Sequence, residues 1–154
     1  MPAATTSMNV TPDARQAFVD LLEEHAGIVR KVAAGYSSSV ADRHDLMQEI
    51  TLQLWKAWPR YAPDRPFSTW MYRIALNVAI SFLRKNTRPG RQTVPLEEVQ
   101  TEIAAEPSGN PEMDERIALL QKMIATLDPL NRALLLLFLD DHSYREIAAI
   151  LSIT

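Results

Sequence analysis

One side of the segment 67–88, FSTWMYRIALNVAISFLRKNTR, carries an amide and several cationic side chains at helical spacing. That polar side consists of Arg73, Asn77, Ser81, Arg84 and Arg88. Arg side chains neutralise phosphates, whereas the amide of an Asn can hydrogen-bond the edge of a base. These residue types in this pattern predict a helix that binds nucleic acid.

The charge distribution along the chain favours the same interpretation. Residues 56–91 hold eight basic and one acidic side chain (net +7), between flanks of four basic and seven acidic (net -3) and four basic and eleven acidic (net -7). Because salt screens charges beyond about 10 Å, such a local field attracts a polyanion even in a chain of net charge -3. A basic cluster alone is more typical of a solvated surface.

The apolar residues of the same segment predict how this helix is positioned. The spacing predicts a buried ridge of Trp70, Ile74, Val78 and Phe82. Aromatic rings nearby, at Tyr61, Phe67 and Tyr72, have the chemistry to stack on unpaired bases, although aromatics at helical spacing more often belong to a core. For Trp55, Trp58 and Trp70 we expect the core role.

Two further helical patterns precede the basic segment. The stretch 14–36 predicts one core helix, with Phe18 and Tyr36 among its apolar positions. The next pattern, DLMQEITLQLWKAW, has a buried ridge of Leu46, Ile50, Leu54 and Trp58. Its opposite side carries Asp45, Gln48, Glu49, Leu52 and Lys56. This side is either a solvated face or a surface for a partner.

A second helical unit follows a Pro-rich acidic stretch. Residues 86–112 contain four of the ten prolines and two of the four glycines, which predicts a flexible linker. Beyond it, Asp128 and Pro129 form a helix start signal, and the apolar run 134–139 predicts the buried centre of this unit. Ser143 and Glu146 are spaced as a capping box, so SYREIAAIL resembles the first helix of a helix-turn-helix, with Ile147, Ala148 and Leu151 facing inward. The expected fold is all-α, with two small helical domains.

Composition excludes several classes of site. The chain has no Cys, and His25, His44 and His142 lack the spacing of metal ligands. No cluster of nucleophile, base and oxyanion donor appears, so we expect no catalytic residues, no metal site and no cofactor. The N-terminal 16 residues lack a signal-peptide pattern, and no stretch approaches the roughly 18 apolar residues of a membrane span. These features predict a cytoplasmic protein without direct membrane insertion.

The order of the motifs resembles a known family. DLMQEITLQLWKAW, YAPDRPFSTWMYRIALNVAISFLRK, an acidic linker and LDPLNRALLLLFLDDHSYREIAAILSIT together are similar to bacterial RNA polymerase sigma factors of the extracytoplasmic-function (ECF) group of the sigma-70 family. The resemblance implies a disordered tail (1–14), region 2 (15–88), a linker (89–111) and region 4 (112–154). The sequence ends within the turn that precedes the recognition helix, so we expect no residue here to read the minus-thirty-five element.

The resemblance implies specific roles in region 2. The helix that docks on the clamp helices of the polymerase's largest subunit matches DLMQEI, which implies core-polymerase binding by Asp45, Gln48, Glu49, Leu52 and Trp55. In the family, a loop and a helix of region 2 read the minus-ten promoter element. The resemblance implies that this loop, which surrounds a flipped base, is formed by Asp64, Arg65, Phe67 and Ser68. It also implies base reading by Asn77 and phosphate binding by Arg73, Arg84, Lys85 and Arg88. The first helix of the helix-turn-helix would begin with Ser143, Tyr144, Arg145 and Glu146.

The implied function is transcription initiation, directed by a non-enzymatic subunit that recognises and melts the minus-ten element. The partners implied are core RNA polymerase, promoter DNA and an anti-sigma factor that regulates transcription by covering the polymerase-binding surfaces. The alternative is a non-enzymatic helical regulator that binds polymerase or an anti-sigma partner without recognising a promoter.

Overall fold

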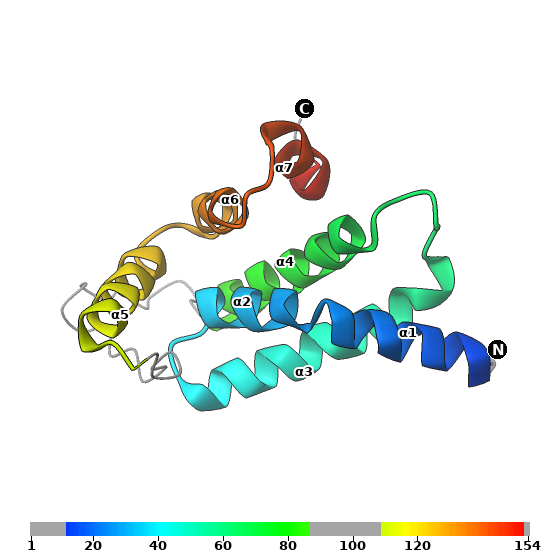
Figure 1. Ribbon diagram of the computed structural model, residues 1–154, viewed down its shortest axis with the longest axis horizontal. Coiled ribbons are helices and arrows are strands. Elements are labelled where there is room, and N and C mark those ends of the chain that lie inside the picture. The colour runs from blue at the N-terminus through cyan, green and yellow to red at the C-terminus, as the bar shows by residue number, and fades with distance from the viewer. Residues whose placement is uncertain (1–11, 87–108, 153–154) are drawn as a thin grey trace.

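The computed structural model describes residues 12–86 and 109–152, and all regular structure within these two ranges is helical. The expected all-α fold is therefore confirmed. An N-terminal unit contains α1 (Pro12–Glu24), α2 (Ala26–Tyr36), α3 (Val40–Ala57), the 3-10 turn η1 (Trp58–Arg60) and α4 (Phe67–Asn86). A C-terminal unit contains α5 (Pro111–Ala125), α6 (Pro129–Leu139) and α7 (Tyr144–Leu151). In Figure 1, α6 and α7 lie along α4, above the helices of the N-terminal unit.

The predicted buried ridge of α3 is confirmed for three of its four residues. Leu46, Ile50 and Leu54 are fully buried, whereas Trp58 packs only partly buried at the edge of the core. The helix begins at a Ser39 cap, whose hydroxyl accepts a hydrogen bond from the backbone N–H of Asp42 at 3.1 Å. Burying one ridge leaves the opposite side of α3 for solvent or a partner.

The predicted ridge of α4 was wrong by about one residue. The fully or nearly fully buried positions are Phe67, Met71, Tyr72, Ala75, Leu76 and Ala79. Trp70, Ile74, Val78 and Phe82 are instead partly buried at the margins of the core. Helices from both units pack on α4, so its buried face is wider than one ridge, and the small side chains Ala75 and Ala79 permit close approach of neighbouring helix axes.

The single helix predicted for residues 14–36 is divided into α1 and α2 at His25. A ring nitrogen of His25 lies 3.0 Å from the backbone carbonyl oxygen of Leu21, which also accepts the His25 backbone N–H at 3.1 Å. The His25 ring further packs against Phe67, with centroids 5.0 Å apart. Packing against the start of α4 thus accompanies the helix break at His25, which apolar spacing alone does not show.

Two helices of the C-terminal unit, α6 and α7, begin at the predicted caps. Asp128 accepts the backbone N–H of Asn131 at 2.7 Å before Pro129, and Ser143 and Glu146 form the full capping box, so both start signals are confirmed. The prediction that the run 134–139 is buried throughout was wrong. Leu137 is fully buried, but about half of the Phe138 and Leu139 surfaces is exposed, because neighbouring helices in the described ranges cover only part of α6.

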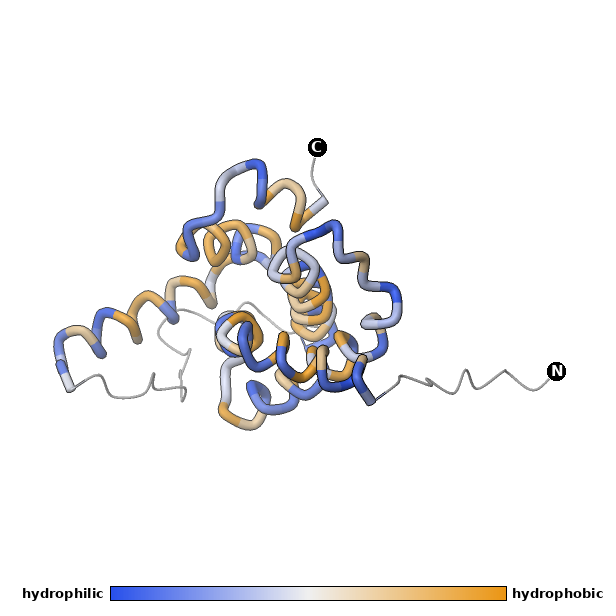
Figure 2. The backbone as a smooth tube through the Cα atoms, turned by 45° about the vertical axis from the view of Figure 1, so that its right-hand side comes forward, coloured by the Kyte–Doolittle hydropathy of each residue, from blue (hydrophilic) through white to orange (hydrophobic). Residues whose placement is uncertain are grey.

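The two units share one hydrophobic core. Ala133 and Leu137 from α6 and Ile147 and Ile150 from α7 belong to the same buried cluster as the core residues of α2 and α4. In Figure 2, hydrophobic stretches recur in both units, and α5 extends to the left with alternating hydrophobic and hydrophilic turns. The sequence left open whether the units pack together, and in this structure they do.

Candidate nucleic-acid interface

The polar side of α4 is accessible along its C-terminal half. Asn77, Ser81, Arg84 and Lys85 are exposed, on the side opposite the buried Ala75 and Ala79. Basic residues in the last turn also complement the helix dipole, which gives Arg84 and Lys85 a structural reason to be there. The arrangement nevertheless presents one amide and two cations together, which is the chemistry needed to contact a base edge and its phosphates.

Asn77 lies in a groove between α3 and α4. The groove has a volume of about 630 Å³ and is lined by Asp45, Glu49, Gln53, Ala57, Ile74, Asn77, Val78, Ser81, Phe82 and Lys85. Two residues predicted to bind polymerase, Asp45 and Glu49, therefore share a surface with two predicted to bind DNA, Asn77 and Lys85. The sequence predicted different roles for these two pairs and did not indicate that they line one groove.

The other predicted polymerase-binding residues lie in a second groove, between α1 and α3. Gln48, Leu52 and Trp55 line this groove of about 800 Å³, together with apolar side chains that include Phe18 and Met47. Leu52 is 44% exposed and contributes to the apolar lining of this groove. The missed residues are those of α1, because nothing in its sequence pattern indicated that it forms a wall of this groove.

The loop before α4 rests on a cluster of aromatic rings. Asp64 and Arg65 are exposed and Ser68 is partly buried, but Phe67 is only 7% exposed and packs against Tyr61 and Trp70. The Tyr61 hydroxyl donates a hydrogen bond to the Arg65 carbonyl at 3.0 Å, so the ring ties the loop to the cluster. Phe67 thus supports the loop from beneath and does not project from its surface.

Arg73, in the N-terminal half of α4, is hydrogen-bonded to the C-terminal unit. Its Nη2 atom donates a hydrogen bond to the Ser152 hydroxyl at 2.9 Å. In the helix-turn-helix segment itself, Tyr144 and Arg145 are exposed, while Ser143 and Glu146 cap the helix. Arg88, the remaining predicted phosphate ligand, and most of the predicted linker lie outside the described residues, as does most of the predicted N-terminal tail.

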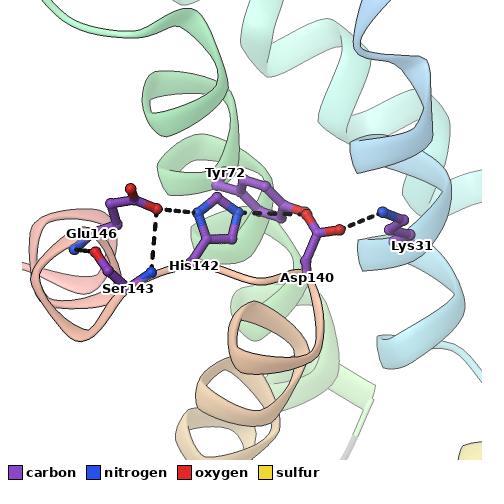
Figure 3. A network of polar contacts seen from close by, with 6 residues as sticks. All are labelled: Lys31, Tyr72, Asp140, His142, Ser143 and Glu146. Carbon is purple, nitrogen blue, oxygen red and sulfur yellow. Dashed lines mark hydrogen bonds and ion pairs between the residues drawn. The ribbon is translucent and has the colours of Figure 1, made fainter.

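A polar network that the sequence did not predict joins the two units. Asp140, which caps the C-terminal end of α6, lies between Lys31 of α2 and Tyr72 of α4 (Figure 3). Partial burial would raise the pKa of Asp140, but hydrogen bonds from Lys31 and Tyr72 and the nearby positive charge lower it below its usual value. Burial is the largest cause that raises the pKa of Tyr72, and the hydrogen bond to Asp140 raises it further. The Tyr72 hydroxyl therefore stays a donor.

A second polar contact between the units is made by a buried cation, the guanidinium of Arg132. Arg132 of α6 is 6% exposed, and burial lowers its pKa. The guanidinium donates to the carbonyl oxygens of Gly35, Ala125 and Leu127 at 3.0, 2.8 and 2.9 Å. The sequence signal for this role was weak, namely one Arg at the start of an apolar helix.

Neither a metal centre nor a membrane segment is found in the parts of the chain that the structure describes. In those parts, no three His, Cys, Asp or Glu side chains are grouped to hold a metal ion. None of the described helices combines the length and apolar character that a membrane crossing requires.

Comparison with known proteins agrees with the geometry. Residues 21–89 match the model of sigma-70 region 2, and residues 117–154 match that of sigma-70 region 4. The chain is 30% identical to the ECF RNA polymerase sigma-E factor of Escherichia coli, over 89% of this chain and 76% of that protein.

Two mycobacterial relatives are longer than this chain. The ECF RNA polymerase sigma factor SigE of Mycolicibacterium smegmatis is 30% identical over 99% of this chain and 60% of its own length. SigG of Mycobacterium tuberculosis is 34% identical over 61% of this chain and 22% of its own length. The chain therefore spans only part of these relatives. Together, the two matched regions and the similarity along nearly the whole chain establish that it belongs to the ECF sigma factors of the sigma-70 family.

Proposed function

We propose that this chain is a cytoplasmic promoter-specificity subunit, which binds core RNA polymerase and directs it to recognise and melt the minus-ten element. The observation that carries the proposal is the groove between α3 and α4. It brings Asn77 and Lys85 onto the same surface as Asp45 and Glu49. A helix that reads a promoter base, packed beside a helix that binds polymerase, couples the two activities within one unit.

The exposed side of α4 supplies the DNA contacts. Asn77 hydrogen-bonds the edge of an unpaired base, while Arg84 and Lys85 bind phosphates. Asp64 and Arg65, on the loop supported by Phe67, and Ser68, in the first turn of α4, surround the flipped base. Extruding a base costs a few kcal/mol, which stacking and edge hydrogen bonds in a pocket offset. The chain itself makes and breaks no covalent bond.

The groove between α1 and α3 supplies the main polymerase contact. Its walls are mostly apolar, and Leu52 and Trp55 offer side chains that a helix of the polymerase clamp can cover. Gln48 adds a hydrogen-bonding group at the same place, and Asp45 and Glu49 add negative charge on the neighbouring face. Apolar burial provides affinity here, and the polar groups fix the register of the partner helix.

Regulation by an anti-sigma factor is part of the proposal. The C-terminal unit exposes large apolar side chains on α5 and α6, including Leu119, Met123, Phe138 and Leu139. Exposed apolar residues in such number are typical of a protein-binding surface. An anti-sigma factor that covers this surface and the α1–α3 groove would hold the chain away from polymerase.

Reconstitution with purified core polymerase tests the proposal. We expect run-off transcription from a promoter library only when this chain is added, with Asn77→Ala reducing open-complex formation more than polymerase binding. Gln48→Ala should do the reverse, and Glu115→Ala, an exposed change on α5, should affect neither. Polymerase binding without selective initiation would contradict the proposal and favour a regulator that does not recognise promoters.

A further inference from the structure

We propose that the C-terminal unit is an intramolecular inhibitor: in the free chain it docks on α2 and α4 through Asp140 and holds Arg73 away from DNA. The docking is inferred only from the contacts between the two units. The inhibition rests additionally on the proposed function, because it takes Arg73 to be a phosphate ligand. The two parts are therefore tested by separate measurements.

The contact centred on Asp140 satisfies both of its carboxylate oxygens from the other unit. Lys31 Nζ lies 2.6 Å from Oδ1, and the Tyr72 hydroxyl donates to Oδ2. The His142 ring packs edge-on against Tyr72, with centroids 5.1 Å apart. A carboxylate at the C-terminal end of a helix is disfavoured by the helix dipole. The position of Asp140 is thus explained by Lys31 and Tyr72 and not by α6 itself.

A second contact makes the docking geometry specific. Arg132 donates to the Gly35 carbonyl, and the Tyr36 hydroxyl donates to the Pro129 carbonyl at 2.7 Å. A Cβ atom on Gly35 would lie 2.7 Å from Cδ1 of Leu136, which is closer than such atoms approach in proteins. Because position 35 has no side chain, α6 can approach α2 closely enough for the polar contacts to form.

The third contact involves the predicted DNA-binding face. Helix α7 packs on α4, and the Ser152 hydroxyl accepts the hydrogen bond from Arg73. Ser152 has φ of 54°, a left-handed conformation that Gly adopts without strain and that costs other residues energy. Ser supplies the hydroxyl that Gly lacks. Asn77, Arg84 and Lys85 remain exposed, so docking would weaken DNA binding without abolishing it.

Single-molecule energy transfer on the full chain measures the separation between the two units. Because the chain has no Cys, Ser38→Cys and Glu115→Cys place one dye on each unit, at exposed positions. The steric probe is Gly35→Gln, whose side chain is too large for Leu136 to avoid by a small shift. Its matched control is Gly27→Gln on the same helix, where a Cβ would approach only Arg30, at 4.0 Å.

We expect high energy transfer in the unaltered chain and in Gly27→Gln. Gly35→Gln and Asp140→Ala should each raise the ratio of open to closed molecules about tenfold, the effect of losing roughly 1.4 kcal/mol. The docking is overturned if the unaltered chain shows the same low-transfer distribution as Gly35→Gln. It is also overturned if both Gly35→Gln and Asp140→Ala leave the distribution unchanged.

Binding to a fluorescent oligothymidylate of about 20 nucleotides tests the inhibition. Gly35→Gln should bind several-fold more tightly than the unaltered chain. Arg73→Ala should weaken binding several-fold in the Gly35→Gln background and little in the unaltered background, where Arg73 is already occupied. Equal effects of Arg73→Ala in both backgrounds overturn the inhibition. If neither background binds the oligonucleotide although energy transfer shows opening, the docking is confirmed and the DNA-binding role of α4 is contradicted.

Discussion

The guanidinium of Arg132 lies over the ring of Tyr36, 5.2 Å from its centroid, and so joins α6 to α2. A buried cation is costly unless all its hydrogen bonds and charges are compensated. Here three carbonyl oxygens accept hydrogen bonds from the two terminal nitrogens and an aromatic face lies against the cation, whereas the buried Nε has no hydrogen-bond partner among the described residues. The two regions of this sigma factor therefore meet at a polar contact within a shared apolar core.

Replacing Arg132 tests this contact. Arg132→Met keeps much of the apolar stem but leaves the Gly35, Ala125 and Leu127 carbonyls without their donor, so we expect it to lower the free energy of unfolding by about 2 to 4 kcal/mol. Chemical denaturation followed by circular dichroism measures this. Arg116→Met, on the exposed side of α5, is the control and should change stability by less than about 0.5 kcal/mol. Equal stability of both variants would contradict the structural role of Arg132.

Two leucines of α3 should separate folding from polymerase binding. Leu54 is fully buried, so Leu54→Ala should cost about 2 to 5 kcal/mol of stability. Leu52 is exposed in the α1–α3 groove, so Leu52→Ala should leave the unfolding free energy nearly unchanged and weaken binding to core polymerase about tenfold. Thermal denaturation and a fluorescence binding assay give the two quantities. A Leu52→Ala chain that binds polymerase normally would remove this groove from the interface.

The cations at the end of α4 should appear in the salt dependence of DNA binding. Arg84→Gln and Lys85→Gln each remove one exposed positive charge from the C-terminal half of α4, which also carries Asn77. If each side chain neutralises a phosphate, the slope of log affinity against log salt should fall by about 0.7 to 0.9 per substitution. Titration of a labelled oligonucleotide at several salt concentrations measures the slope. Lys122→Gln on α5 changes the net charge equally and should leave the slope unchanged, so a similar decrease there would indicate only a general charge effect.

The cap of α7 gives a local test of the helix-turn-helix segment. Ser143→Ala removes the hydroxyl that accepts the Glu146 backbone N–H at 3.2 Å, and should destabilise the chain by about 1 kcal/mol. Native-state hydrogen exchange should show faster exchange in α7 while α3 remains protected. Uniform acceleration in both helices would mean that the two units open only together.

The sequence predicted the parts of this structure that depend on local patterns. The α3 ridge of Leu46, Ile50 and Leu54 and the caps at Asp128 and Ser143 follow from spacing and from hydrogen bonding within a few residues, and all were confirmed. The family itself was also predicted correctly from the combination of two motifs.

The parts that depend on tertiary packing were missed. The α4 ridge was shifted because residues from α6 and α7 cover a second side of that helix, which its own periodicity does not show. Asp140 was assigned no role from the sequence, because its partners are 109 and 68 positions away in the chain. The roles of Asn77 and of the polymerase-binding residues stay predictions, since they depend on contacts with other molecules.

The most direct test of the central claim is the permanganate reactivity of thymines in the minus-ten element, with core polymerase and this chain bound to a promoter selected from the library. We expect reactive, unpaired thymines with the unaltered chain and at least about tenfold lower reactivity with Asn77→Ala at equal polymerase occupancy. Undiminished reactivity with Asn77→Ala, or none with the unaltered chain bound to polymerase, would contradict the assignment of α4 as the helix that reads and opens the promoter.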